Sequence, residues 1–412
     1  LLAHAGGWRA GGAHMTPAID PALAAQRRRV IAAGVCGLIL TVGLGRFAYT
    51  PLLPLMREQA GLSHAAGGWL AAFNYLGYLS GALLAASISD VALKYRLYRW
   101  GLLLAIVSLP AMGLTEHFAI WALLRYLSGL GSTAGLLLAS GLVLNWLIRH
   151  QLRAELGAHF AGLGLGVVVS GLAVGAMLPR LDWSAQWLAL GVLGLGFFLP
   201  AWCWMPAPQL AGTSSTPTVT PPSSRWMRYF MAAYFCAGVG YVVSATFIVA
   251  IVENHPALAG WGSGIWMLIG LAAVPSCFVW DRLTRELGQM PAILLAYAVQ
   301  ALAIALQAFS DGLWLNLLSA LLYGVTFVGI VSLALSIVGR TLPANPAKAM
   351  ARLTLSYGVA QIAAPALAGT LAQLTGSYRG ALWVAAGMVG VGMGFLWAMW
   401  QCEQQDKAAQ LR

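Results

Sequence analysis

The stretch GLGRFAYTPLLP, from Gly43 to Pro54, decides the fold because a related stretch follows it 195 residues later. That second stretch is GVGYVVSATFIV, from Gly238 to Val249, and the GxG of one lies over the GxG of the other. The same offset carries Gly129 onto Gly324. Recurrence at one offset in several apolar segments indicates an internal duplication, so we expect two homologous halves.

The composition shows which solvent these halves meet. Of the 412 residues 60% are hydrophobic and 8% are charged, whereas soluble domains are about 45–50% apolar and about 25% charged. A membrane-spanning helix needs about 20 apolar residues, and the apolar runs predict twelve of them. These are expected near 30–56, 66–88, 100–115, 119–147, 156–178, 184–204, 229–252, 261–279, 291–309, 313–338, 352–374 and 380–401. A soluble domain and a single-span anchor are excluded.

A segment rich in Pro, Ser and Thr separates the two sets of six helices. It reads PAPQLAGTSSTPTVTPPSS, and such a composition favours a flexible linker. Residues 1–14 precede a candidate start at Met15, and we expect them to lie outside the fold. The expected organisation is an N-terminal segment at 1–28, a six-helix half at 29–205, a linker at 206–225, a second half at 226–402 and a tail at 403–412.

Basic residues are distributed unequally between the two sides of the predicted helices. Eighteen Lys and Arg fall on the side that holds both termini, against three in the opposite loops. This bias predicts that both termini are cytoplasmic. It also accounts for the net charge of +11 without a nucleic-acid partner. The five cysteines are far apart and show neither a disulfide framework nor metal-ligand spacing, so no metal or cofactor is expected.

Two motifs connect this pattern with a known family. RYLSGLGSTAG places Arg125, Gly129 and Gly131 in an RxxxGxG spacing, and an acidic-basic loop follows each second helix of a half. With its two six-helix halves, the chain resembles the major facilitator superfamily of secondary transporters. The segments at 43–56 and 67–81 (GGWLAAFNYLGYLSG) resemble those of the bacterial YbfB/YjiJ-type carriers. The resemblance implies an all-α inner-membrane protein of twelve transmembrane helices, monomeric, moving a small molecule by rocking two pseudo-symmetric halves.

Arg46 and Arg125 lie inside predicted membrane helices, where an unpaired guanidinium costs upwards of about 2.5 kcal/mol. None of the twelve acidic residues lies deep in a predicted helix, so neither arginine has a carboxylate partner there. Guanidinium groups bind carboxylates and phosphates in forked pairs. An organic anion is therefore the expected substrate. The alternative for Arg125 is a structural role, bonded to helix carbonyls.

Polar side chains on neighbouring helices complete the predicted substrate site. Their positions follow helical spacing: Tyr49 comes three residues after Arg46, Asn74 and Tyr78 share a face, and Tyr357 and Gln361 share another. Tyr241 is the repeat-mate of Arg46. That these helices enclose a cavity is implied by the family resemblance. The predicted substrate-binding set is Arg46, Tyr49, Asn74, Tyr78, Arg125, Tyr241, Tyr357 and Gln361.

The acidic-basic loops predict a reversible cytoplasmic latch between helices. Exposed ion pairs are worth about 0–1 kcal/mol, which is small enough to be broken and remade in each transport cycle. The alternative is that these are ordinary solvated loop charges. The predicted latch residues are Asp90, Lys94 and Arg96 in the first half and Asp281, Arg282 and Arg285 in the second.

Other functions remain as alternatives at this stage. Within carriers, the alternative is an exporter of neutral or hydrophobic compounds, such as sugars or drugs, in which both arginines are structural. A membrane enzyme would need clustered acids, bases or a metal, which the sequence lacks, and a non-transporting sensor is a further remote alternative. His159 is the one histidine near a helix interior, and we expect it to lie at the helix end and face the headgroups or loop water.

Overall fold

The computed structural model describes residues 20–152, 156–208, 223–256, 258–341 and 346–410, and within these ranges the chain is helical without strands. Residues 1–14 and the part of the predicted linker at 209–222 fall outside the described residues. The last two residues of the predicted linker already belong to α9. The first half contains α1 (Pro21–Leu38), η1 (Ile39–Phe47), α2 (Tyr49–Gln59), α3 (His64–Ser87), α4 (Val91–Met112), α5 (Phe118–Thr133), η2 (Ala134–Leu138), α6 (Ala139–Arg149), α7 (Gly157–Met177) and α8 (Trp183–Trp204). The second half contains α9 (Ser224–Glu253), α10 (Gly262–Ala273), α11 (Ser276–Leu287), α12 (Gln289–Phe309), α13 (Leu313–Thr341), α14 (Pro346–Thr375) and α15 (Arg379–Gln410).

Over the described ranges, these segments form the twelve expected helices. Ten continuous helices are long and apolar enough to cross a membrane, and α10 with α11 makes an eleventh that is bent by 44°. Pro275 lies at that bend. Proline donates no backbone hydrogen bond and disrupts the preceding turn, so it accounts for the bend. The twelfth is α4, which begins nine residues earlier than predicted because the Asp90 side chain caps it, accepting from the amide of Ala92 at 2.8 Å.

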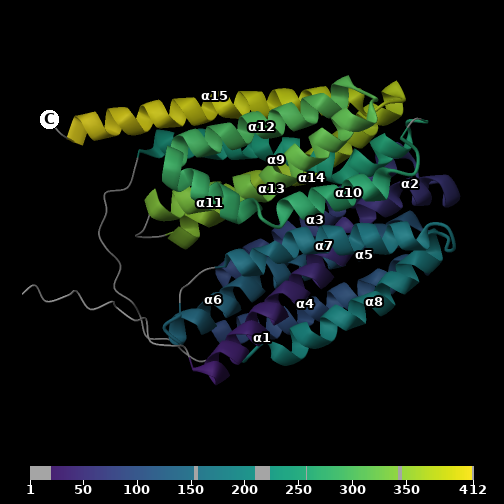
Figure 1. Ribbon diagram of the computed structural model, residues 1–412, viewed down its shortest axis with the longest axis horizontal. Helices are drawn as coiled ribbons and strands as arrows, with labels where there is room; N and C mark the ends of the chain where they lie inside the picture. The colour runs from purple at the N-terminus through teal and green to yellow at the C-terminus, as the bar shows by residue number, and fades with distance from the viewer. Residues whose placement is uncertain (1–19, 153–155, 209–222, 257, 342–345, 411–412) are drawn as a thin grey trace, which may run out of the picture.

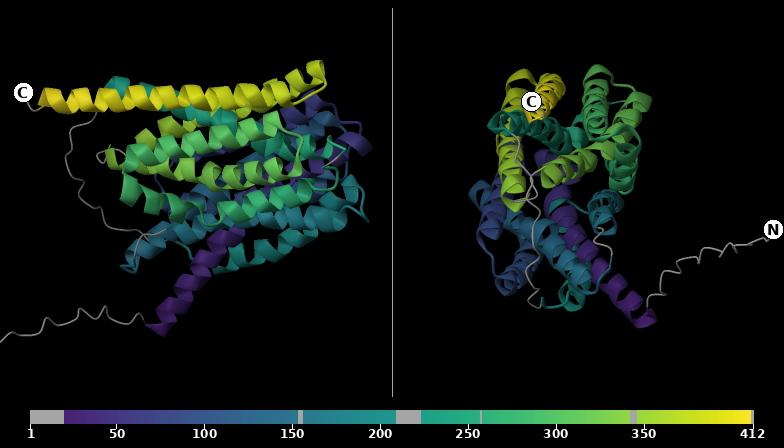
Figure 2. Two further views of the ribbon diagram at one scale, coloured as in Figure 1. Left: turned by 45° about the horizontal axis from the view of Figure 1, so that its top comes forward. Right: turned by 90° about the vertical axis from the view of Figure 1, so that its left-hand side faces the viewer.

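The helices run side by side in two groups (Figure 1). Between the groups α3 packs on α14, α7 on α10 and α2 on α9. The first turn of α1 and the last turn of α15 lie at the same end of the bundle (Figures 1 and 2). We call this the basic end, which includes the α3–α4 and α11–α12 connections; the opposite end carries the α2–α3, α9–α10 and α14–α15 connections.

The glycines of the RxxxGxG spacing bring α5 close to two neighbours. A Cβ atom on Gly129 would overlap the carbonyl oxygen of Asn74 in α3. One on Gly131 would lie 2.9 Å from the carbonyl oxygen of Gly101 in α4. Only glycine permits this approach, so this part of the motif serves helix packing.

The first membrane helix changes its winding halfway along. It is α-helical to Leu38 and then π-helical from Ile39 to Phe47, and α2 begins at Tyr49. Pro51 accounts for the break near Ala48, because its ring clashes with the carbonyl group four residues earlier. All nine residues of the π-helix are buried, including Arg46. Wide π-helical turns often lie at functional sites.

His159 differs from its prediction, because it is 1% exposed and does not face loop water. Its Nε2 lies 2.8 Å from the hydroxyl of Ser140, which itself donates to the carbonyl of Leu136 at 2.6 Å. Nε2 therefore carries the hydrogen and donates to Ser140. Nδ1 packs against Gly34 and has no hydrogen-bond partner among the described residues. The prediction failed because α7 turns this side chain towards α1 and α6.

Candidate functional site

A cavity of about 230 Å³ lies between the two groups of helices. The first half contributes side chains from η1, α3, η2 and α7, and the second from α9, α11, α13 and α14. Five of the residues predicted to bind substrate line its wall, namely Arg46, Tyr78, Tyr241, Tyr357 and Gln361. The fold therefore brings together residues that are more than 300 positions apart in the sequence.

Arg46 is the charged group of this cavity. It is 5% exposed, and its guanidinium carbon lies 4.5 Å from the ring centre of Tyr78 and 5.0 Å from that of Tyr75. Its Nε and Nη2 atoms have no hydrogen-bond partner among the described residues. Arginine stays charged in proteins, and each buried donor left unpaired costs about 1–3 kcal/mol. The cavity wall therefore contains a buried cation held by aromatic rings, with two donors that no described residue pairs.

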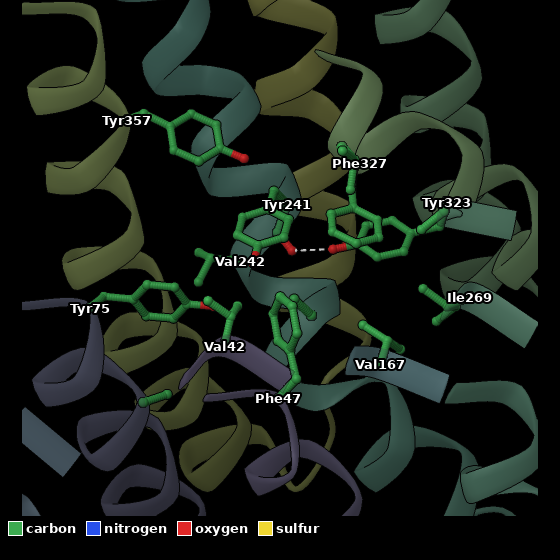
Figure 3. Packing of buried hydrophobic residues seen from close by; sticks show 14 of the residues in the cluster. Val42, Phe47, Tyr75, Val167, Tyr241, Val242, Ile269, Tyr323, Phe327 and Tyr357 are labelled. Carbon is green, nitrogen blue, oxygen red and sulfur yellow. Dashed lines mark hydrogen bonds between the residues drawn. The ribbon is translucent and has the colours of Figure 1, made fainter. Parts of the chain in front are cut away.

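Aromatic rings of the second half lie in a row beside the cavity, and Figure 3 shows Tyr241, Tyr323, Phe327 and Tyr357 among them. Tyr234 stacks on Tyr357 with ring centres 4.4 Å apart, and Tyr357 on Tyr241 at 5.8 Å. Tyr241 stacks on Phe327 at 5.7 Å, and Phe327 on Tyr323 at 5.6 Å. The Tyr323 hydroxyl donates to the backbone carbonyl of Tyr241 at 2.6 Å, which ties α13 to α9. We call these five residues the aromatic stack.

Arg125 has different surroundings from Arg46, although it is as deeply buried. Its Nη1 donates to the carbonyl of Gly45 at 2.9 Å and its Nε to that of Leu70 at 3.3 Å. These bonds tie α5 to η1 and α3. Arg125 is not part of the cavity wall. These contacts favour the structural alternative for this residue over direct substrate binding.

Tyr49 and Asn74 also point at backbone groups instead of the cavity. The Tyr49 hydroxyl donates to the carbonyl of Gly67 at 2.9 Å, and its ring lies 4.4 Å beneath the guanidinium of Arg125. Asn74 is fully buried, and its Nδ2 donates to the carbonyl of Arg125 at 3.0 Å. The two residues therefore connect α2, α3 and α5 outside the cavity.

Direct contacts between the two halves seal the cavity at the opposite end. The Thr50 hydroxyl in α2 donates to the carbonyl of Ala245 in α9 at 2.6 Å. In α3, a Cβ on Gly68 would overlap the carbonyl oxygen of Pro365 in α14. The backbones of the two halves touch here, which holds the halves together at this end.

A hydrogen-bonded chain extends this seal across the end loops. Arg57 donates to Nε2 of His64, and Nδ1 of His64 lies 2.8 Å from the hydroxyl of Tyr378, which belongs to the second half. Arginine can only donate, so Nε2 must accept and the ring hydrogen lies on Nδ1. The ring of Tyr378 stacks on Phe247 at 4.6 Å. The seal therefore contains a neutral His64.

Among the described residues, a second cavity lies towards the basic end. It measures about 370 Å³ and lies between α3, α4 and α6 on one side and α13 and α14 on the other. It shares Leu137, Leu335 and Thr354 with the central cavity, so the two cavities are neighbours.

The predicted latch residues surround this second cavity or lie on the surface beyond it. Lys94 lines the cavity, Asp90 caps α4, and Arg282 pairs with Glu286 of its own helix at 2.9 Å. Arg96, Asp281 and Arg285 are exposed. No ion pair within the described part of the chain joins these residues across the two halves. The latch therefore stays a prediction for a conformation in which the basic end is closed.

Tyr75, Tyr234 and Phe327 were absent from the predicted site. Helical spacing could have indicated them, because Tyr75 precedes Tyr78 by three residues, Tyr234 precedes Tyr241 by seven and Phe327 follows Tyr323 by four. Tyrosine and phenylalanine are frequent in apolar helices as packing residues, so spacing alone did not single these out.

A protein family described as uncharacterised MFS-type transporter YbfB matches residues 38–396. The chain belongs to this family. It is a membrane transporter of the major facilitator superfamily, as its motifs suggested, and not an enzyme. The chain is 24% identical over 267 residues to the uncharacterised MFS-type transporter YceJ of Bacillus subtilis, covering 62% of this chain and 67% of that protein.

Two further similarities cover less of the chain or have a lower identity. The 4-hydroxybenzoate transporter PcaK of Pseudomonas putida is 26% identical over 178 residues, or 42% of this chain and 39% of PcaK. The crystal structure of the nucleoside transporter NupG superposes with a TM-score of 0.71 at 14% identity, covering 91% of this chain and 99% of that one. The second similarity supports the fold alone.

Proposed function

We propose that this protein is a secondary active transporter that carries a small organic anion across the bacterial cytoplasmic membrane by alternating access. The observation that carries the proposal is Arg46, a buried cation with two unpaired donors in a cavity built by both halves. A carboxylate would accept from these donors and neutralise the charge. PcaK is named for an organic anion, 4-hydroxybenzoate, and this agrees with the proposal.

The excess of basic residues supports a cytoplasmic position for the basic end and for both termini. We infer that the described conformation is inward-facing, because the second cavity lies beside the central one on the cytoplasmic side and the seal at Thr50, Gly68 and His64 faces outwards. Outward opening would require these contacts to break while the basic end closes. Closure would bring Lys94 in α4 nearer to α13 and α14, and we propose that the latch forms then. The carrier acts as a monomer in this proposal.

The test is uptake into proteoliposomes and thermal-shift binding with small carboxylates, neutral compounds and cationic compounds. Arg46→Gln removes the proposed anion-binding group. Arg99→Gln is a matched control, because the Arg99 guanidinium lies 3.6 Å from the ring centre of Trp202, away from the cavity. We expect carboxylate binding and uptake that Arg46→Gln abolishes and Arg99→Gln retains.

Transport of only neutral or cationic compounds, unchanged in a folded Arg46→Gln protein, would overturn the anion proposal. It would favour the alternative, an exporter of neutral or hydrophobic compounds with structural arginines. The apolar residues of the cavity wall are compatible with such a substrate. A substrate without an acceptor group would, however, leave the donors of Arg46 unpaired.

A further inference from the structure

We propose that the anion bound at Arg46 is a planar aromatic monocarboxylate of a single ring, held with its carboxylate on the guanidinium and its ring against the aromatic stack. This inference rests on the proposed function and specifies its substrate class. It follows from three properties of the cavity, which are its charge, its size and its aromatic wall.

The charge of the cavity limits the ligand to one negative group. Of the described residues that line it, Arg46 alone is charged. The acidic residues of the sequence all lie near the ends of the predicted helices, so no carboxylate is available for the ammonium group of an amino acid. A second carboxylate on the ligand would likewise lack a cation. A buried charge without a partner is strongly unfavourable, so zwitterions and dicarboxylates are disfavoured.

The size of the cavity limits the ligand to about one ring. At about 230 Å³ the cavity is below the usual range for sites that hold drug-sized ligands, which begins at about 300 Å³. A single-ring carboxylate such as benzoate is well below drug size.

The aromatic stack determines what the ligand body meets. Tyr357, Tyr241 and Phe327 form a row of near-parallel rings, with neighbouring centres 5.8 and 5.7 Å apart, and all three line the cavity. They offer aromatic surface to anything inside the cavity. A ligand ring can pair with these rings in an offset or edge-to-face arrangement, whereas a saturated ring gains no such pairing. Because the stack is held by its own contacts, it needs no rearrangement to accept the ligand.

Most of the remaining wall is apolar. It includes Val42, Phe160, Leu163, Val328 and Val331. A sugar or another body with many hydroxyls would lose hydrogen bonds to water here without regaining them. An apolar ring loses none, so the apolar wall favours the same class of ligand.

The experiment measures binding of five compounds to the purified protein by titration calorimetry in detergent. The reference compound is benzoate. Cyclohexanecarboxylate tests the effect of removing aromaticity, and succinate tests a second negative charge. Benzamide tests the loss of the charge, and phenylalanine tests a zwitterion. We expect benzoate to bind about two- to tenfold more tightly than cyclohexanecarboxylate, which is the range for an edge-to-face aromatic pair. Succinate, benzamide and phenylalanine should bind at least tenfold more weakly than benzoate.

Two variants test whether the aromatic stack contacts the ring of the ligand. Phe327→Leu should reduce the preference for benzoate over cyclohexanecarboxylate to less than twofold. Phe198→Leu is the matched control, because Phe198 stacks on Trp202 in α8 outside the cavity, and it should leave the preference unchanged. If Phe327→Leu does not fold, Tyr241→Leu serves the same purpose, and the comparison of compounds on the unaltered protein needs no variant.

The outcomes distinguish this inference from the proposed function. Equal affinity for benzoate and cyclohexanecarboxylate, or tighter binding of succinate, would overturn the aromatic assignment. If that binding still depended on Arg46, the proposed anion site would stand. If no carboxylate binds in an Arg46-dependent manner, both the inference and the proposed function are overturned.

Discussion

Replacing Arg46 with Met should make the protein more stable, whereas the same change at Arg125 should make it less stable. At Arg46 the two unpaired donors cost roughly 4 kcal/mol together at the middle of the known range. The contacts of its guanidinium with the rings of Tyr75 and Tyr78 offset roughly 2 kcal/mol of this cost. Methionine fills a similar volume without buried donors, so we expect a net gain of about 2 kcal/mol.

At Arg125 the balance has the opposite sign. Methionine would remove two hydrogen bonds from a charged donor to backbone carbonyls, at about 1.5–3 kcal/mol each. The carbonyl of Gly45 keeps a second bond from the Ser128 hydroxyl at 2.8 Å, whereas that of Leu70 loses the side-chain donor. We expect a loss of about 4 kcal/mol, because no unpaired donor is relieved in exchange.

The assay is thermal unfolding of the purified variants in one detergent, without added ligand. At about 2 °C per kcal/mol, the apparent Tm should rise by about 4 °C in Arg46→Met and fall by about 8 °C in Arg125→Met. Arg46→Met should also lose the stabilisation by benzoate that the unaltered protein shows. A fall of the Tm in Arg46→Met as large as that in Arg125→Met would refute the reasoning, since it would mean that Arg46 is as well paired as Arg125.

Three further predictions concern packing and pH. Gly129→Ala should impair folding by several kcal/mol, seen as loss of monodisperse protein in size-exclusion chromatography, because the new Cβ overlaps the carbonyl of Asn74. Acidification to about pH 5 should open the sealed end, because a protonated His64 would put a second donor against Arg57. Labelling of Thr50→Cys by an impermeant maleimide, in a background without native cysteines, should rise on acidification, and His64→Gln should remove that rise. The hydrogen bond from Arg379 lowers the pKa of the Asp311 carboxyl, so the ionised Asp311 stabilises the fold above about pH 4. The difference in stability between the unaltered protein and Asp311→Asn should vanish as the pH falls further. A difference that stays constant with pH would contradict this assignment.

Much of the fold followed from local composition. A run of about 20 apolar residues has few stable alternatives to a membrane helix, so the helix positions could be read directly. The start of α4 was misplaced because its basic first turns lie among polar residues, and only the cap by Asp90 shows that the helix has already begun. The wide turns at Ile39–Phe47 also escaped prediction, since their hydrogen bonds depend on the close crossing of Gly43 with Gly166 as well as on Pro51.

The candidate site was only partly predictable, as the two buried arginines show. The sequence by itself determined that both lie in membrane helices without a carboxylate, because this depends on the order of residues alone. Only the tertiary structure decided that Arg125 meets the carbonyls of Gly45 and Leu70, while Arg46 meets tyrosine rings and open space. The physical reason is that helix rotation and crossing determine which backbone groups come within hydrogen-bond distance of a side chain. Contacts between helices that are far apart in the chain set both quantities, and they assemble the aromatic stack from α9, α13 and α14 in the same way.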